Sequence, residues 1–162
     1  SRLESGLTED DFQPVDFVEL VQESAERFAA QADQTDLDFH LTLPAQPVTV
    51  TGSIEQLRRA VDNLLDNALK FTPSPGQIHL TLSDNDNWTT LVVEDSGIGI
   101  FEDDLPFIFH RFHRGRNTAD YTGSGLGLAM VKTIIEHHRG YITVSSHPEQ
   151  GTRVSVRLPV IS

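Results

Sequence analysis

Asn63, Asn67 and Lys70 stand four and three residues apart within the segment VDNLLDNALKFTP. In a helix, which turns by roughly 100° per residue, this spacing aligns the three side chains along one narrow stripe. An amide oxygen can ligate Mg²⁺ and an ammonium group can contact phosphate, so the stripe would suit a metal-bound phosphate. A solvated polar face is the simpler interpretation of these residues alone, although asparagine is a mediocre helix former for that purpose.

A carboxylate with two nearby glycines follows in the segment VVEDSGIGI, where a strand pattern ends at Asp95. The carboxylate could accept a hydrogen bond from an amino group, while Gly97 and Gly99 would let a flat ring approach the backbone. A turn capped by the aspartate is the alternative, and such turns are common.

Three glycines alternate in the segment TGSGLGL, at Gly123, Gly125 and Gly127, and an apolar helical pattern follows at once. Glycines at the start of a helix expose backbone N–H groups and a partial positive charge, which together attract anions. The segment is neither a Walker A loop, because Leu128 follows the last glycine, nor the dinucleotide fingerprint. A flexible hinge is the alternative, and it explains one glycine better than three.

Basic and aromatic residues interleave in the segment FIFHRFHRGRNTADYT of an otherwise acidic chain. They are Phe107, Phe109, Arg111, Phe112, Arg114 and Arg116. Two interpretations stay open: a short helix anchored by its aromatic side chains, or a mobile lid whose arginines reach phosphate oxygens.

Helical and extended patterns alternate around these segments, with turn residues between them. We expect helices at 14–33, 54–70 and 125–138, a helical turn at 103–109, and strands at 37–44, 48–52, 77–84, 88–95, 140–146 and 152–159. Ser53 is the expected N-cap of the second helix. This order predicts an α/β two-layer sandwich in which helices cover one face of a mixed sheet.

The composition excludes several classes of function. The 162 residues suit one domain, and 38% hydrophobic residues are enough for a core. Without cysteine, the chain has no disulfide, zinc–thiolate site or thiol catalysis. A net charge of −12 argues against nucleic acid binding, and it requires local positive groups or a metal wherever an anion binds. No apolar run approaches the roughly 18 residues of a membrane span.

Four of these segments occur in a fixed order, NLLDNALKFT, DSGIGI, FIFHRF and GSGLGLA, and GTRVSVRLP follows near the end. They resemble the N box, first glycine box, F box, second glycine box and closing segment of sensor histidine kinases, over roughly residues 11–160. The resemblance implies the Bergerat (GHKL) fold shared with the gyrase and Hsp90 ATPases, with a mixed sheet of about five strands and three helices on one face. It also implies that residues 1–10 are the tail of a preceding dimerisation helix and that residues 11–162 form an ATP-binding catalytic domain.

The resemblance implies an adenine pocket and a metal site. Asp95 would accept a hydrogen bond from the adenine amino group, with Gly97 and Gly99 shaping the pocket. Asn67 would ligate Mg²⁺, with Asn63 beside it.

The resemblance also implies groups around the phosphates of ATP. Lys70 would contact phosphate, and Phe71 would lie near the nucleotide. Arg114 and Arg111 would address the phosphates or the phosphoacceptor. The hinge of the lid and the phosphate-facing start of the next helix would consist of Gly123, Gly125, Leu126 and Gly127.

Asn63 favours phosphoryl transfer over hydrolysis. Hydrolytic relatives carry a glutamate four residues before the magnesium-binding asparagine, and that glutamate activates water. Here the position is Asn63, which cannot act as a base. Transfer to a histidine needs positioning and charge stabilisation more than a deprotonated water.

The implied function is donation of the γ-phosphoryl group of ATP to a histidine on a separate dimerisation domain, and from there to an aspartate of a response regulator. No histidine followed by Glu or Asp on a long helix occurs in the sequence, so we expect the chain to be a fragment. We expect the isolated domain to be monomeric and cytoplasmic, and the full-length kinase to be a homodimer, with or without an anchor in the inner membrane. Two alternatives stay open: a serine kinase of the anti-sigma-factor type, and a nucleotide-sensing module without catalytic activity.

Overall fold

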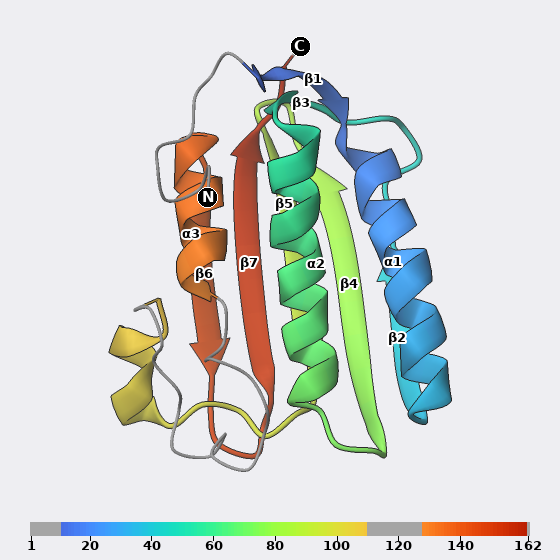
Figure 1. The fold of residues 1–162 in the computed structure, drawn as a ribbon, viewed down its shortest axis with the longest axis vertical. Helices are drawn as coiled ribbons and strands as arrows, with labels where there is room; N and C mark the ends of the chain where they lie inside the picture. The colour runs from blue at the N-terminus through green and yellow to red at the C-terminus, as the bar shows by residue number, and fades with distance from the viewer. Residues whose placement is uncertain (1–10, 110–127, 162) are drawn as a thin grey trace.

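The computed structural model describes residues 11–109 and 128–161, and a five-stranded mixed sheet runs through them (Figure 1). From one edge to the other, the strands are β2 (Leu37–Thr42), β4 (Gly76–Asp84), β5 (Trp88–Asp95), β7 (Thr152–Pro159) and β6 (Tyr141–Ser146). β2 is parallel to β4, and the other neighbouring pairs are antiparallel.

Helices cover one face of this sheet (Figure 1). Within the described ranges they are α1 (Phe17–Gln34), α2 (Ile54–Lys70) and α3 (Leu128–His137). A separate antiparallel pair, β1 (Gln13–Asp16) and β3 (Thr49–Gly52), lies at one end, and the short 3-10 helix η2 (Glu102–Phe107) follows β5. The predicted two-layer α/β sandwich is confirmed. None of the helices in these two ranges is long and apolar enough to cross a membrane.

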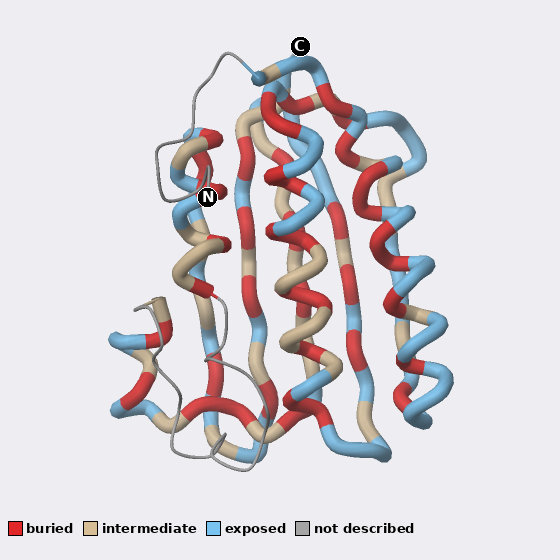
Figure 2. Tube along the Cα trace, in the orientation of Figure 1, coloured by how far each residue is buried: buried red, intermediate tan, exposed pale blue. Residues whose placement is uncertain are grey.

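The core lies between the helices and the face of the sheet that they cover (Figure 2). Alternate residues of the central strands point into it, among them Ile78, Leu80 and Leu91, each at most 1% exposed. They meet an apolar stripe on α2 that consists of Leu57, Ala60, Val61, Leu64, Leu65 and Ala68. Side chains alternate across a strand and recur every three to four residues on a helix, so the sequence pattern alone specifies this interface.

The other face of the sheet has no helix over it among the described elements. It carries an aromatic cluster near the start of β5, where the Arg157 guanidinium lies 4.8 Å from the centre of the Trp88 ring. The rings of Trp88 and Tyr141 are 5.6 Å apart. Such a cation–π contact holds the ring in place on an otherwise polar surface.

Two local differences from the predicted elements have clear physical causes. α1 begins at Phe17, later than predicted, because Asp16 caps the helix by accepting a hydrogen bond from the Glu19 N–H at 3.1 Å. Residues 13–16 pair instead with β3, a long-range contact that no local pattern encodes. Ile54, the first residue of the helix predicted at 54–70, is 36% exposed because it lies in the first turn, so the apolar stripe of α2 begins at Leu57.

The two ends of the sheet bring different elements together. The Asp95 end combines the last residue of β5 with the C-terminal turn of α2 and the first residue of α3. The His138 end, uppermost in Figure 1, combines the N-cap of α2 with the C-terminal end of α3 and the β1–β3 pair. Both α2 and α3 therefore connect one end to the other.

Candidate functional site

Asp95 is the last residue of β5, and backbone N–H groups hold its carboxylate in place. Its Oδ1 accepts hydrogen bonds from Gly97 N at 2.9 Å and from Thr152 N at 3.3 Å. The second bond follows from the strand register, because Thr152 pairs with Asp95 across β5 and β7. The carboxylate is thus oriented by the fold itself, independently of any ligand.

Burial raises the pKa of Asp95 from 3.8 to about 6, because desolvation disfavours the charged carboxylate. Hydrogen bonds from Gly97 and Thr152 and the nearby Thr72 hydroxyl lower this pKa in part, while the like charge of Glu94 raises it. The Thr72 Oγ1 is itself buried and makes no regular hydrogen bond with the described residues. A desolvated carboxylate with incomplete compensation favours a ligand that brings a hydrogen-bond donor.

The loop after β5 packs so closely against neighbouring backbone that two of its positions require glycine. A Cβ atom on Gly97 would overlap the carbonyl of Phe71, and one on Gly99 would overlap the carbonyl of His147. Gly99 also has a φ of 72°, a left-handed conformation that is costly for other residues. Ile98 N donates to the Phe71 carbonyl at 3.0 Å, which fastens the loop to the C-cap of α2.

Asp95 and Asn67 line one small cavity between the sheet, α2 and this loop. The cavity measures about 40 Å³, and its remaining lining is Leu64, Ala68, Phe71, Val93, Gly99, Ile100, Leu128, Thr152 and Val154. Apolar walls with one oriented carboxylate suit a flat heteroaromatic ring that carries an amino group. Complete small-molecule pockets measure roughly 300–1,000 Å³, so the described residues form only the inner part of such a site.

The predicted polar stripe on α2 is not a plain solvent face. Asn63 and Asn67 are half-buried, and the Nδ2 of Asn63 is buried with no hydrogen-bond partner in the part of the chain that the structure describes. Leaving such an amide unpaired costs about 1–3 kcal/mol, which a solvent-facing residue would not incur. Lys70 is exposed, and its Nζ lies 3.2 Å from the Asp66 Oδ2 one turn earlier. This exposed ion pair is weak enough for a phosphate to replace it.

The other predicted site residues lie outside the described ranges: Arg111, Arg114, Gly123, Gly125, Leu126 and Gly127. α3 begins directly after them at Leu128, which lines the same cavity as Asn67. The N-terminal end of a helix carries a partial positive charge, so α3 adds attraction for an anion at the Asp95 end. Within 11–109 and 128–161, no group of three His, Asp or Glu side chains could hold a metal ion. A cation at Asn67 would therefore need oxygen ligands from its anion as well.

Sequence reasoning missed Thr152 and Ser146, which complete the site from the far strands. Ser146 Oγ accepts from Ile100 N at 2.8 Å and donates to the Gly151 carbonyl at 2.8 Å, so it ties the loop after β5 to β6 and β7. Both residues reach the site through strand pairing. The closing segment GTRVSVRLP contains Thr152, but no local pattern reveals that its strand lies beside β5.

Comparison with known proteins places the chain in a family. Residues 52–162 match the family described as Histidine kinase-, DNA gyrase B-, and HSP90-like ATPase. Sensor histidine kinase RppB of Synechocystis sp. is 35% identical over 164 residues, which cover 100% of this chain and 36% of RppB. The chain spans 11–36% of the length of curated relatives such as RppB.

Solved structures have the same fold. The mycobacterial sensor histidine kinase MprB superposes with a TM-score of 0.79 at 35% identity, over 91% of this chain and 98% of that one. Full-length ShkA in complex with AMPPNP gives 0.83 at 27% identity, over 99% of this chain and 34% of that one. The chain therefore belongs to the histidine kinase-, DNA gyrase B- and HSP90-like ATPase family, and within it to the catalytic ATP-binding domains of sensor histidine kinases.

Proposed function

We propose that the domain binds Mg·ATP at the Asp95 end and donates the γ-phosphoryl group to a histidine on a separate dimerisation domain. The observation that carries this proposal is the cavity that Asp95 and Asn67 line together. The names of the relatives support it, and so does the AMPPNP in the ShkA complex.

Asp95 would select adenine by the direction of its hydrogen bond. The exocyclic amino group of adenine donates to a carboxylate, whereas guanine presents a carbonyl oxygen at the same ring position, and two acceptors repel each other. The buried Thr72 hydroxyl beside the carboxylate offers a further hydrogen bond to the base or to a water molecule. The glycines at 97 and 99 keep side chains away from the plane of the ring.

The phosphates would lie near the last turn of α2 and the start of α3. Asn67 would hold Mg²⁺ together with phosphate oxygens, since this ion commonly takes few protein ligands, and the ion would neutralise phosphate charge. Lys70, Arg111 and Arg114 would add positive charge, and the glycine segment would add backbone N–H groups. Such local groups are needed in a chain whose net charge is −12.

Asn63 supports transfer over hydrolysis. Its side chain offers no carboxylate that could take a proton from water, and its Nδ2 is a buried donor without a partner among the described residues. This donor can orient an acceptor atom of the ligand. The nucleophile would be the ring nitrogen of the acceptor histidine, and the phosphoryl group would pass on to an aspartate of a response regulator.

The proposal assigns residues 11–162 to the ATP-binding domain and residues 1–10 to the tail of a dimerisation helix. We further propose that the isolated domain is a monomer and that the full-length kinase is a homodimer. We also propose the cytoplasmic location that the sequence led us to expect.

Asp95→Asn tests the role in base binding, with Glu94→Gln as the matched control. Glu94 precedes Asp95 on β5, points to the opposite face of the sheet, and lies 3.9 Å from Arg153. A hydrogen bond to a charged group contributes roughly 1.5–3 kcal/mol, so the Kd for Mg·ATP should rise about 10- to 150-fold in Asp95→Asn. It should stay unchanged in Glu94→Gln. Titration calorimetry measures both, and equal affinity in all three proteins would overturn the assignment.

Phosphotransfer is tested by adding a histidine-bearing dimerisation domain and labelled ATP. We expect acid-labile phosphohistidine on the added domain and no label on this chain. Acid-stable phosphoserine on a protein substrate would instead identify a serine kinase. Tight nucleotide binding without any transfer would identify a sensing module, and either result would refute the histidine kinase activity.

A further inference from the structure

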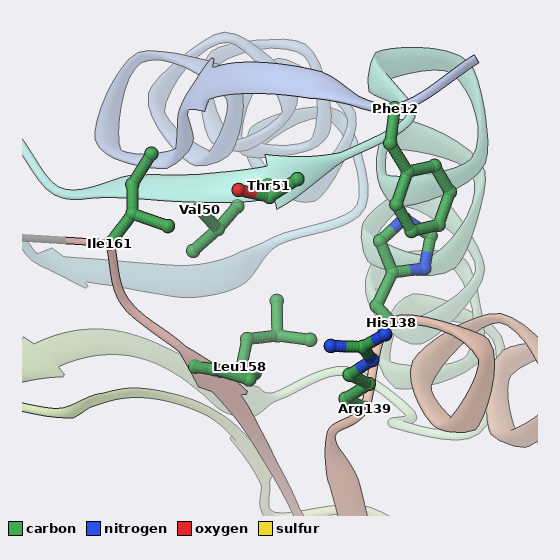
Figure 3. A pocket seen from close by; sticks show the side chains of 8 residues that line it. Phe12, Val50, Thr51, His138, Arg139, Leu158 and Ile161 are labelled. Carbon is green, nitrogen blue, oxygen red and sulfur yellow. The ribbon is translucent and has the colours of Figure 1, made fainter. Parts of the chain in front are cut away.

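Buried polar groups connect distant parts of the chain at both ends of the sheet. At the His138 end, the imidazole Nδ1–H donates to the Ile134 carbonyl at 2.7 Å, and its Nε2 accepts from Ser53 N at 3.1 Å. His138 thereby joins α3 to the N-cap of α2 and forms one wall of a cavity of about 380 Å³ (Figure 3). At the Asp95 end, the hydroxyl of Ser146 lies buried at the last residue of β6, which is 5% exposed.

The Ser146 hydroxyl uses its full hydrogen-bonding capacity. Its Oγ accepts from Ile100 N at 2.8 Å and donates to the Gly151 carbonyl at 2.8 Å. The Thr152 Oγ1 lies 2.8 Å from the same oxygen and is the donor of that bond, because the single hydroxyl hydrogen of Ser146 is directed at the Gly151 carbonyl. A hydroxyl has one hydrogen and two lone pairs, so these bonds leave none of them unused.

The bond to the Gly151 carbonyl reaches Asp95 through a single peptide group. The Gly151 C=O and the Thr152 N–H belong to the same planar unit, and this N–H donates to the Asp95 Oδ1 at 3.3 Å. Ser146 therefore holds, from behind, the peptide that orients the carboxylate. Hydrogen bonds in series polarise one another, so each bond strengthens the next. We call this series, from Ile100 N through the Ser146 hydroxyl and the Gly151–Thr152 peptide to Asp95, the Ser146 relay.

The Ser146 relay begins and ends at the loop after β5. Ile100 N, its first donor, follows Gly97 in that loop, and the Gly97 N–H also donates to the Asp95 Oδ1 at 2.9 Å. The turn between β6 and β7 supports the same loop at another point, where Glu149 N donates to the Ile98 carbonyl at 2.6 Å. The loop, the turn and the carboxylate thus form one closed network, in which a displaced part changes the direction of the carboxylate.

We propose that Ser146 is a positioning residue for nucleotide binding. Its partners Ile100 and Thr152 line the cavity beside Asp95, whereas Ser146 is not among the described residues that line it. Its effect on a ligand therefore passes through those partners, which hold the carboxylate in the orientation that a base would meet. A site oriented in advance binds more tightly because less order has to be gained on binding. The inference rests on the proposed function, in which Asp95 accepts a hydrogen bond from adenine.

Ser146→Ala tests the role in binding, with Ser145→Ala as the matched control. Ser145→Ala removes the same hydroxyl one residue earlier, where the side chain is exposed on the face of the sheet that no described helix covers. Loss of the relay should raise the Kd of the folded protein for Mg·ATP roughly three- to tenfold, the effect of weakening one hydrogen bond or two. The Kd of Ser145→Ala should equal that of the wild type. Titration calorimetry measures the Kd values, and circular dichroism checks the fold.

Ser146→Thr separates the hydroxyl from the space that the side chain fills. It keeps the hydroxyl, so its Kd should stay within about twofold of the wild type. Ser146→Cys, with its weakly hydrogen-bonding thiol, replaces Ser146→Ala if that variant is unfolded. Wild-type affinity in Ser146→Ala would overturn the positioning role. A folded Ser146→Thr that binds as weakly as Ser146→Ala would also overturn it, because the hydroxyl would then make no difference.

Hydrogen exchange followed by NMR tests the Ser146 relay without nucleotide. In Ser146→Ala, the Thr152 amide should exchange roughly three- to tenfold faster relative to the Val156 amide in the middle of β7, because its peptide is held less firmly. A general loss of stability, which a purely structural role would produce, speeds both amides and leaves their ratio unchanged. An unchanged ratio would therefore overturn the relay. Wild-type protein that does not bind Mg·ATP would instead refute the proposed function, and the exchange ratio would still decide whether Ser146 acts on this peptide.

Discussion

Each end of the sheet holds a titratable side chain whose pKa is shifted by burial, and the two pKa values shift in opposite directions. Burial raises the pKa of Asp95 to about 6 and lowers the pKa of His138 from its usual 6.5, so both neutral forms are favoured. The ends differ in how completely the group is paired. Both ring nitrogens of His138 are hydrogen-bonded within the fold, whereas Asp95 faces a cavity beside the Thr72 hydroxyl, which has no regular partner among the described residues.

This difference teaches that burial and a shifted pKa do not by themselves mark a binding site. A buried group whose hydrogen bonds all end within the protein is part of the scaffold, and incomplete pairing beside a cavity is the better indicator. The backbone also differs between the two ends of the sheet. Gly97 lets the loop at the Asp95 end contact neighbouring carbonyls, while Arg139 keeps a long side chain in a conformation that suits glycine.

Removing the buried imidazole should give the largest effect. His138→Ala leaves a cavity and an unpaired Ser53 N–H, so the free energy of unfolding should fall by about 3–4 kcal/mol in urea denaturation. His79→Ala, on the open face of the sheet, is the control and should change it little. The affinity of the folded protein for Mg·ATP should not change. A large loss of affinity would show that the two ends are coupled.

His138→Ala should also lose a part of the pH dependence that the free energy of unfolding has in the wild type. Because folding lowers the pKa of His138, the unfolded chain takes up the proton first, and this contribution to stability is lost as the pH falls below 6.5. Asp95 acts in the opposite sense: its raised pKa makes stability decline as the pH rises from 3.8 to about 6. Comparing wild type with His138→Ala across this range separates the two contributions.

Gly97→Ala should disturb the Asp95 end alone. The added Cβ would overlap the Phe71 carbonyl, and overpacking of this kind costs about 2–3 kcal/mol of unfolding free energy. Nucleotide binding should be lost at the same time, because the loop that orients Asp95 must move. Asp86→Ala, in the exposed turn between β4 and β5, is the control for the assay. Wild-type affinity in Gly97→Ala would mean that this loop does not shape the site.

The affinity for Mg·ATP should depend on the charge of Asp95. Protonation below pH 6 removes the carboxylate that accepts the amino hydrogen, so the affinity should fall as the pH falls, by up to about tenfold per pH unit. Asp95→Asn should abolish this dependence together with most of the binding. Titration calorimetry at several pH values measures the slope, and a flat profile in the wild type would argue against a carboxylate contact with the base.

Arg139→Gly should change the free energy of unfolding least, and it should raise this free energy rather than lower it. Relief of the left-handed conformation, offset by the greater freedom of glycine in the unfolded chain, should raise the free energy of unfolding by about 0.5–1 kcal/mol. Glu149→Gly, at a φ of 62° near the other end, is the matched control and should gain a similar amount. A loss of stability in Arg139→Gly alone would mean that contacts of the arginine side chain outweigh the strain.

Local patterns predicted the elements well where the signals were local. The bounds of α2 agree with the prediction because Ser53 caps the helix and its apolar spacing is continuous. The start of α1 was wrong because pairing of β1 with the distant β3 decides it. The order of the strands depends on pairing between residues far apart in the sequence, which a short stretch of sequence does not reveal. The contact of Thr152 with Asp95 depends on this pairing too.

The site could be predicted only through the combination of motifs. The spacing predicted that Asn67 lies on a polar stripe, but only the family resemblance predicted that it lies near Asp95. In the structure both residues line the same cavity. The roles of all predicted site residues stay predictions, including those of Asp95 and Asn67 and of the arginines and the glycine segment outside the described ranges. The orphaned Asn63 Nδ2 had no sequence signal, because burial on a helix depends on what packs over it.

The stacked Trp88 gives the molecule a built-in optical reporter. It is the single tryptophan of the chain, held under Arg157 at the start of β5, where it pairs with Pro159 at the His138 end. Seven residues of extended strand, about 23 Å, separate it from Asp95. Its fluorescence emission should therefore change when the His138 end loosens. It should stay constant when a ligand binds at the Asp95 end.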